Sequence, residues 1–233
     1  MLFSWNNDTI KWYEAASEYT GFYKNLASAV EPMVKGAGTF ADMGCGIGLV
    51  DLELAPSVGN VLCVDVSEQA TAYLRGRVRA RGIENIDVIQ ANCFDIDKVF
   101  DVIYLCFFSS RDIERFLPKC KKLISVVGGD NNAPLFPQSY RKKSKNTIEG
   151  EKQYLDGLHL SYRLKECEFE FGQPLETRED AGLYVRTYAP EIPQEELDGF
   201  LESRLIRTGS EKYPFYMPRK KMVGIFEVDG SLR

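Results

Sequence analysis

An apolar segment that ends in an acid and runs directly into a glycine turn constrains this chain more than any other feature. Residues 39–43 have the composition of a buried strand, and glycines follow at positions 44, 46 and 48. Alternate glycines let the backbone turn sharply with positive φ and let a ligand approach it closely. The apolar residues 49–55 predict a helix after the turn. Open α/β sheets bind nucleotides at such a place, between the carboxyl end of a strand and a helix N-terminus.

The spacing of the glycines distinguishes between kinds of nucleotide site. The dinucleotide fingerprint G-x-G-x-x-G would place its third glycine at position 49, which is Leu49 in this chain. The third glycine instead falls at Gly48, and Asp42 precedes the turn. A carboxylate at Asp42 opposes a pyrophosphate at short range but favours a cationic ligand. A nicotinamide dehydrogenase is therefore the disfavoured alternative for this fold, and a glycine turn that only packs a helix on a strand is the structural alternative.

The segment 42–48 resembles the first signature of the class I S-adenosylmethionine-dependent methyltransferases. The resemblance implies S-adenosylmethionine (SAM) as cofactor, S-adenosylhomocysteine as its product, and Asp42 beside the cationic methionine tail. It covers residues 39–127 well and the terminal strand 222–228 moderately. It implies a doubly wound α/β fold with a mostly parallel seven-stranded sheet and helices on both faces. In that fold, the terminal strand lies antiparallel between the fifth and sixth strands.

A second acid ends the next predicted strand. Asp65 lies about 20 residues past the glycine turn, where an acid in nucleotide-binding α/β folds accepts hydrogen bonds from ribose hydroxyls. Such bonds to a carboxylate are charge-assisted and stronger than neutral ones. The alternative is that Asp65 caps the next helix, for which Ser67 is also a plausible N-cap.

The loop after the third predicted strand carries a weaker signal. In the methyltransferase family an acid or amide in this loop faces the adenine amino group, and Asn92 matches as an amide. The resemblance then implies Cys93 and Phe94 along the adenine ring. The full cofactor set implied by the resemblance is Asp42, Gly44, Cys45, Gly46, Gly48, Asp65, Val66, Asn92, Cys93, Phe94 and Leu105.

The segment after the fourth predicted strand departs from one branch of the family. Enzymes that methylate amide or nucleobase nitrogens often carry [D/N]-P-P-[Y/F] there, whereas residues 106–109 read Cys-Phe-Phe-Ser. This difference disfavours a DNA or glutamine N-methyltransferase and leaves an apolar mouth. Tyr13, Tyr19 and Phe107 are candidate contacts of the acceptor. No catalytic residue is assigned, because orienting the reactants can by itself contribute about 7–11 kcal/mol.

The remaining pattern predicts one methyltransferase domain over residues 1–233. A helical cap (1–38) precedes the SAM-binding core (39–127), and a variable substrate-recognition region (128–220) precedes the closing strand (221–229). The aromatic residues of the cap are expected to cover an edge of the sheet and to fold over the cofactor. The strands are expected at 39–43, 61–65, 86–90, 99–105, 122–127, around 167–171 and at 222–228. The helices are expected at 49–55, 68–81, 112–119, about 147–158, from 177, and 193–206.

Composition excludes several other classes of protein. At 44% hydrophobic and 27% charged residues, the 233-residue chain is ordinary for a globular protein. Its apolar run 102–108 is too short to span a bilayer, and its first residues lack the pattern of a signal peptide, so a cytoplasmic location is expected. Six cysteines without a C-x-x-C pair predict reduced thiols, and the single histidine, His159, predicts neither a metal site nor a His-based triad.

Three functional hypotheses follow. The first is methyl transfer from SAM to an O, N or S atom of a small molecule. The second is methylation of RNA, motivated by the basic runs 141–145 and 219–221, although the net charge of −5 disfavours broad binding to nucleic acid. The third is a SAM-binding protein without turnover.

Overall fold

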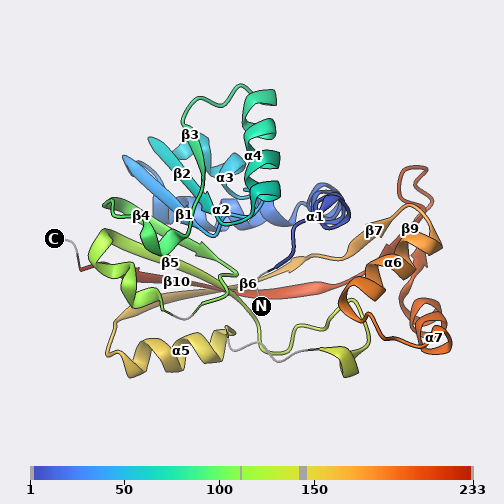
Figure 1. The fold of residues 1–233 in the computed structure, drawn as a ribbon. Helices are drawn as coiled ribbons and strands as arrows, with labels where there is room; N and C mark the ends of the chain where they lie inside the picture. Colours follow the sequence, from blue (N-terminus) through green and yellow to red (C-terminus); the bar gives the residue numbers. More distant parts are fainter. Residues whose placement is uncertain (1–2, 111, 142–145, 232–233) are drawn as a thin grey trace.

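A seven-stranded sheet forms the centre of the computed structural model, which describes residues 3–110, 112–141 and 146–231 (Figure 1). The strand order is β3-β2-β1-β4-β5-β10-β6. The strands are β1 (Thr39–Met43), β2 (Asn60–Asp65), β3 (Ile86–Gln90), β4 (Phe100–Cys106), β5 (Cys120–Gly128), β6 (Tyr162–Glu170) and β10 (Lys220–Asp229). Only β10 runs antiparallel to its neighbours β5 and β6; the other pairs in this sheet are parallel. The mostly parallel α/β fold and the place of the terminal strand are thus confirmed.

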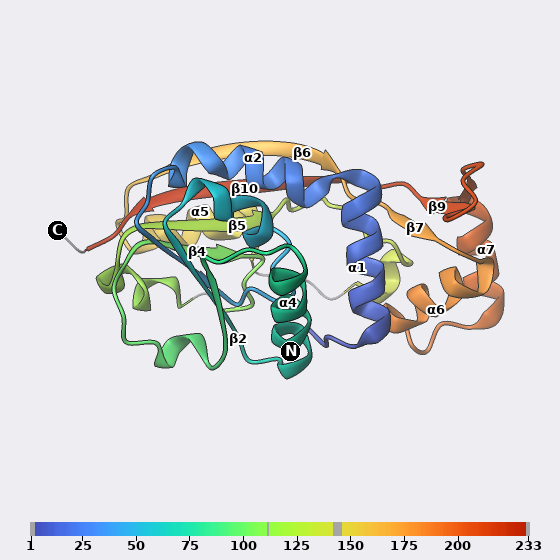
Figure 2. The ribbon, with the colours of Figure 1, turned by 90° about the horizontal axis from the view of Figure 1, so that it is seen from above.

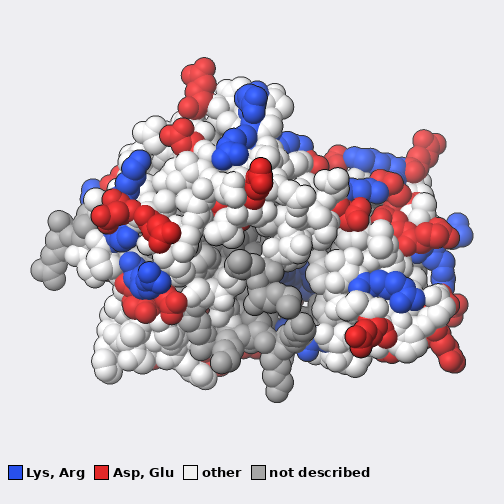
Figure 3. Space-filling model, in the orientation of Figure 1, with Lys and Arg blue, Asp and Glu red and all other residues white. Residues whose placement is uncertain are grey.

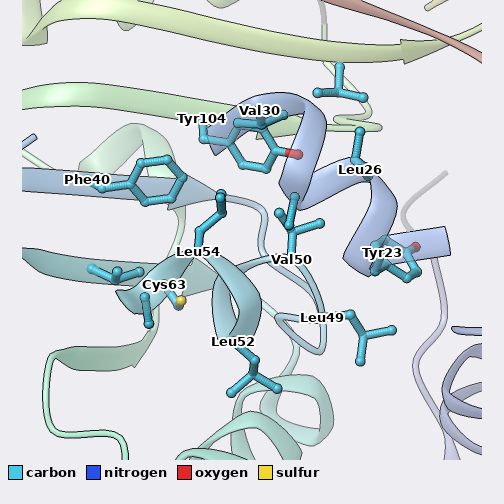
Figure 4. Packing of buried hydrophobic residues seen from close by; sticks show 14 of the residues in the cluster. Tyr23, Leu26, Val30, Phe40, Leu49, Val50, Leu52, Leu54, Cys63 and Tyr104 are labelled. Atoms are coloured by element: carbon cyan, nitrogen blue, oxygen red, sulfur yellow. The ribbon is translucent and has the colours of Figure 1, made fainter. Parts of the chain in front are cut away.

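Both faces of the sheet are apolar, and successive side chains along a strand contribute to them in turn. On β4, Tyr104 belongs to one buried cluster and its neighbours Ile103 and Leu105 belong to the other. Successive side chains of a strand point to opposite faces, so both faces need a covering layer. Helices α2 (Phe22–Val34), α3 (Asp51–Leu54) and α4 (Glu68–Ala80) supply buried residues on the Tyr104 face (Figure 4), and α5 (Ile148–Gly157) does so on the opposite face.

The N-terminal cap consists of two helices. Helix α1 (Asn7–Thr20) ends at Gly21, which has φ +67°, and α2 begins directly after it. Glycine adopts this left-handed conformation without the steric cost that other residues pay, so the chain changes direction there. Helix α2 then lies along the sheet, whereas α1 lies beyond it, next to a second group of elements (Figure 2). The cap therefore covers a face of the sheet and reaches past it.

This second group is a small lobe at the end of the long β6–β10 pair. It contains the sheet β7-β9-β8 and two helices, which are orange and red in Figure 1. Its elements are β7 (Gln173–Leu175), α6 (Arg178–Tyr188), α7 (Gln194–Arg204), β8 (Ile206–Arg207) and β9 (Phe215–Met217). Trp12 of α1 is buried in the apolar core of the lobe, and its indole Nε1 donates a hydrogen bond to Asp180, 3.1 Å away. The lobe is therefore held against the cap by packing and by a hydrogen bond.

Local signals predicted most elements of the core but not all of them. Ser67, Thr147 and Thr177 cap helices with their side chains, as helix-start patterns indicate. The helix expected at 112–119 is wrong: the chain forms two 3-10 turns, Ile113–Arg115 and Leu117–Lys119. Pro118 lies within that segment, and a proline inside an α-helix lacks the N–H donor and clashes with the preceding turn. The short strands β7, β8 and β9 were not predicted.

Candidate functional site

The glycine turn adopts the geometry that its sequence demands. Gly44, Gly46 and Gly48 all have positive φ, at +92°, +54° and +66°. The amides of Gly44 and Cys45 donate to the carbonyl of Val64 at 2.7 and 3.0 Å, which ties the turn to the end of β2. This arrangement fixes the turn at the carboxyl end of the parallel strands, where α/β sheets bind their ligands.

A cavity of about 530 Å³ lies against this turn. Its walls include nine residues of the predicted cofactor set: Asp42, Gly44, Cys45, Gly46, Asp65, Val66, Asn92, Cys93 and Phe94. The cavity also includes the acceptor candidates Tyr13 and Phe107. Ligand sites are typically concave, mostly apolar clefts of about 300–1,000 Å³, so this cavity has the size of a small-molecule site.

Three predicted residues lie elsewhere. Gly48 packs against α4, where a Cβ atom would come within 2.5 Å of Leu74. Leu105 is fully buried in the core on the opposite face of the sheet, because alternation along β4 turns its side chain away. Tyr19 lies outside the cavity walls and stacks near Tyr216 of the lobe, with ring centroids 4.8 Å apart. Gly48 and Leu105 therefore belong to the packed core next to the cavity rather than to its walls. Tyr19 contacts the lobe.

Asp65 connects the second strand to the glycine turn. One carboxylate oxygen accepts from the Gly46 amide at 2.8 Å, and the other accepts from the Ser67 amide at 2.8 Å. Ser67 in turn caps α4 through its side chain. A carboxylate has about four lone-pair sites, so each oxygen keeps acceptor capacity toward the cavity. The cap of α4 is therefore Ser67 rather than Asp65, and the bonds of Asp65 to the amides of Gly46 and Ser67 leave acceptor sites for the expected ribose role.

Two buried carboxyls lie at the inner end of the cavity. Asp42 and Asp51 are only 2% and 0% exposed, and three of their four oxygens lack a hydrogen-bond partner among the described residues. Burial, reinforced by the mutual repulsion of the two groups, raises the pKa of Asp42 well above its usual range. Burial also raises the pKa of Asp51 to about 6. An ammonium or sulfonium cation would offset both effects, so this end of the cavity fits the cationic methionine portion of SAM. Asp51 was missed from the sequence, although its place in the first helical turn after the glycines is a usable signal.

Aromatic residues of the N-terminal cap form one wall of the cavity. Phe3, Trp5 and Tyr13 pack edge-to-face, with ring centroids 4.6–5.2 Å apart. Trp5 lies directly over the glycine turn, where a Cβ atom on Gly46 would come within 2.6 Å of the indole. Glycine is thus the residue that lets the indole approach the turn, and the aromatic cap predicted from the sequence is present at the cavity.

The position of the two tryptophans allows a direct test of this arrangement. Trp5 lines the cavity, whereas Trp12 is buried in the core of the lobe. Ligand binding in the cavity is expected to change the intrinsic tryptophan fluorescence of the wild-type protein during titration with SAM. Trp5→Phe should remove that change, and the control Trp12→Phe should keep it. A change that persists in Trp5→Phe and disappears in Trp12→Phe would show that the ligand binds elsewhere.

The loop after β3 forms another wall. The Asn92 side-chain oxygen accepts from the Phe94 amide at 3.2 Å and starts the 3-10 turn Cys93–Asp95. The Phe94 ring stacks on Phe116, with centroids 5.2 Å apart, and the guanidinium of Arg115 lies 4.0 Å above its centroid. These contacts hold the Phe94 ring in place at the wall of the cavity.

The segment after β4 forms the mouth of the cavity. Phe107 has φ +51°, which is uncommon for a residue with a side chain. Its amide is held by the carbonyl of Val126 at 2.8 Å, and Phe108 packs against the glycine turn, 2.9 Å from where a Cβ atom of Gly44 would lie. Residues kept in such backbone conformations concentrate at functional sites.

Searches for other kinds of site gave no candidate in the described part of the chain. Within residues 3–110, 112–141 and 146–231, no group of three or more His, Cys, Asp or Glu is placed to hold a metal ion. The six cysteines are free thiols. Among the described helices, none is long and apolar enough to cross a membrane.

Comparisons with known proteins identify the domain family and the fold. Residues 40–128 match the model of a methyltransferase domain family. No curated protein matches the chain. The YcgJ protein from Bacillus subtilis is similar in structure, with a TM-score of 0.52 at 11% identity, covering 88% of this chain and 97% of that protein. A putative methyltransferase from Bacillus halodurans has a TM-score of 0.52 at 11% identity, covering 90% of this chain and 97% of that protein.

The [4+2]-cyclase SpnF is also similar, with a TM-score of 0.54 at 14% identity, covering 90% of this chain and 82% of that protein. At such identities the structural matches show the fold alone, and a shared fold does not set the reaction. The reaction class follows from the family match across β1 to β5, the segment that builds the cavity. Residues 40–128 therefore carry a class I SAM-dependent methyltransferase domain, which makes this protein an enzyme with SAM as its methyl donor.

Proposed function

We propose that this enzyme methylates an O, N or S atom of a small molecule, mainly by orienting it against the cofactor. The observation that carries the proposal is the cavity at the glycine turn, whose walls include Phe3, Trp5 and Tyr13 and in which the Trp5 indole lies over Gly46. SAM, when bound, supplies a methyl group that is already electrophilic because it is attached to a sulfonium. Placement of the acceptor then supplies most of the rate, since well-oriented reactants gain about 7–11 kcal/mol.

Each part of the cavity has a proposed partner on SAM. Asp65 accepts hydrogen bonds from the ribose hydroxyls, in addition to its bonds with the amides of Gly46 and Ser67. Phe94 packs on the adenine ring beside Asn92. Asp42 and Asp51 bind the cationic methionine end. These roles leave the mouth at Phe107 for the acceptor.

The whole chain is proposed to form one methyltransferase domain, in which the two variable regions are expected to bind and select the acceptor. The cap, residues 1–38, supplies the aromatic cover, and the region 128–220 includes the lobe built from β7 to β9. Both lie outside the segment that matches the family model. Their chemistry, rather than that of the shared core, is therefore expected to select the substrate.

The RNA hypothesis receives little support from the basic residues. Within the run 219–221, Lys220 is exposed and pairs with Glu168 at 3.2 Å, whereas Arg219 and Lys221 line a cavity. On the face in Figure 3, blue and red side chains are interspersed rather than separated. The basic residues Lys142, Lys143 and Lys145 lie outside the described residues. A phosphate backbone is usually bound by a continuous basic surface, so a small acceptor is favoured.

Calorimetric titration with SAM, S-adenosylhomocysteine and NAD tests the proposal first. Binding of SAM and S-adenosylhomocysteine without NAD is expected, because the acids at positions 42 and 51 oppose a pyrophosphate. Production of S-adenosylhomocysteine with small O, N or S nucleophiles is the second measurement. Turnover with RNA but with no small molecule in the panel would contradict the proposed acceptor class. Binding of SAM without turnover of any acceptor would instead favour a non-catalytic SAM-binding protein.

A further inference from the structure

A second, smaller cavity lies between α1, the lobe and the end of the β6–β10 pair. Its volume is about 120 Å³, and half of its wall residues are aromatic, with Tyr13, Phe171, Tyr184 and Tyr188 among them. It also contains two basic residues, Arg219 and Lys221. A dry cavity of about 150 Å³ is enough to hold benzene, so this one has room for a small charged group.

The two basic side chains share one face of the chain. Arg219 directly precedes β10 and Lys221 is its second residue, so the two lie on the same side of the extended chain, while Lys220 between them is exposed. Arg219 uses its Nε to donate to the carbonyl of Phe171 at 2.9 Å. Neither Arg219 nor Lys221 forms an ion pair with another described residue. Two half-buried cations thus face the same space without an anion.

Aromatic rings surround the ammonium of Lys221. Its Nζ lies 3.5 Å from the ring centroid of Phe107 and 4.9 and 5.1 Å from those of Phe171 and Phe22. Burial, together with the nearby Arg219, lowers the pKa of Lys221 to about 7. Cation–π contacts with these rings favour the charged form of Lys221, whereas burial and the charge of Arg219 oppose it. An anion in the cavity would restore a full positive charge on this residue.

The second cavity adjoins the mouth of the cofactor cavity. Tyr13 lines both cavities. Phe107 lines the cofactor cavity and carries Lys221 on its ring. A molecule bound beside Phe107 is therefore able to extend one group toward the two cations. Burial raises the pKa of Tyr13 to about 12, so this residue presents a neutral hydroxyl to such a group.

We propose that the methyl acceptor is a small organic carboxylate whose anionic group binds between Arg219 and Lys221. A planar guanidinium matches a carboxylate geometrically, and the tyrosine walls suit a flat or apolar body. One carboxylate is able to accept from both cations through its two oxygens, and a cavity of about 120 Å³ suits this small planar group better than a tetrahedral phosphate. This inference rests on the proposed methyl transfer, since it assigns the substrate class of the same site.

The test measures binding to the protein loaded with S-adenosylhomocysteine, which separates it from turnover. Benzoate and benzamide are the probes, because they have nearly the same shape and differ in charge. In calorimetric titrations, benzoate is expected to bind at least about tenfold more tightly than benzamide, which corresponds to about 1.4 kcal/mol. Equal binding of the two probes, or binding of neither, would overturn the inference.

Matched variants of neighbouring residues locate the effect. Arg219→Met and Lys221→Met are each expected to lose about tenfold or more in benzoate affinity while benzamide is unaffected. Lys220→Met removes the same charge from the solvent side of the strand and should leave benzoate affinity within about twofold. Equal losses in Lys220→Met and Lys221→Met would show a non-specific charge effect and contradict the site. If Arg219→Met does not fold, the inference is still tested by Lys221→Met and by the comparison of benzoate with benzamide on the wild-type protein.

The affinity for S-adenosylhomocysteine distinguishes this inference from the proposed function. It should be unchanged in all three variants, since the second cavity lies beside the cofactor cavity rather than within it. If S-adenosylhomocysteine fails to bind the wild type, the assignment of the cofactor cavity is wrong. If it binds and benzoate does not, only the carboxylate class of acceptor is wrong.

Discussion

Replacing Asp65 with alanine is expected to abolish most SAM binding. The carboxylate holds the amides of Gly46 and Ser67 and is the proposed partner of the ribose hydroxyls. Loss of two charge-assisted hydrogen bonds, at about 1.5 kcal/mol or more each, predicts an affinity loss of about a hundredfold or more. The amide of Gly46 would also lose its only described acceptor, so the turn itself is expected to loosen. Calorimetric titration with SAM measures the effect.

A second aspartate provides the control. Asp87 lies on the exposed side of the edge strand β3 and outside the cavity walls, so Asp87→Ala should bind SAM as the wild type does. Circular dichroism of both variants shows whether the fold is retained. A folded Asp65→Ala protein with an affinity within a few-fold of the wild type would refute the ribose assignment.

Affinity for SAM is expected to fall steeply in acid because of Asp42 and Asp51. In the ligand-free protein, burial raises the pKa of Asp51 to about 6 and that of Asp42 well above its usual range. A bound cation favours the ionised carboxylates, so binding below these pKa values must release protons. The affinity should therefore decrease by about tenfold per pH unit for each proton released, over the range below pH 6, which titrations between pH 5 and 8 measure.

Nearby groups do not account for this pH dependence. The thiols of Cys45, Cys63 and Cys106 and the hydroxyl of Tyr104 surround the pair, and burial raises the pKa of Cys63, Cys106 and Tyr104. The pKa of Cys45 is also raised, even though its largest single influence, a hydrogen bond with Cys63, acts to lower it. All four groups are thus neutral below pH 8, and the Asp pair remains the titrating unit at this end of the cavity.

The same residues should have the opposite effect on the ligand-free protein, whose free energy of unfolding should decrease as the pH rises. Because the folded-state pKa of Asp51 lies above its unfolded value of 3.8, the folded protein binds the proton more tightly. The stabilisation is therefore complete at low pH and is lost as the pH rises from about 4 through 6.

Asp51→Asn should remove this loss and raise the melting temperature at pH 8, while weakening SAM binding. A variant that is less stable at pH 8, or a SAM affinity that is constant from pH 5 to 7, would contradict the role of the pair.

Local patterns in the sequence were sufficient for the core of the fold. The strand–turn–helix around Gly44, the acid at the end of β2 and the N-cap at Ser67 each depend on residues close together in the chain. Turn geometry, strand alternation and capping are short-range effects, so they can be read without knowing the fold. The prediction of a helix at 112–119 was wrong because it left out the effect of Pro118, which is also a local rule.

Alternation also explains why one residue of the cofactor set was misplaced. Leu105 and Cys106 are adjacent at the end of β4, yet Leu105 is buried in the core and Cys106 lines the cavity. A shift of one residue moves a side chain to the other face of a sheet. The choice between them needed the register of β4 against its neighbours, which the sequence pattern did not specify.

The sequence by itself therefore determined the class of fold, the position of the glycine turn and the acid at the end of β2. Tertiary structure alone decided that Trp5 covers Gly46, that Asp42 and Asp51 are buried as a pair, and that Arg219 and Lys221 face a cavity beside Phe107. Some of these features bring together segments that are far apart in the chain. The others depend on which neighbouring residues exclude water from a charged side chain. Burial and long-range packing arise only when the elements assemble, and they set the charge states that govern binding at this site.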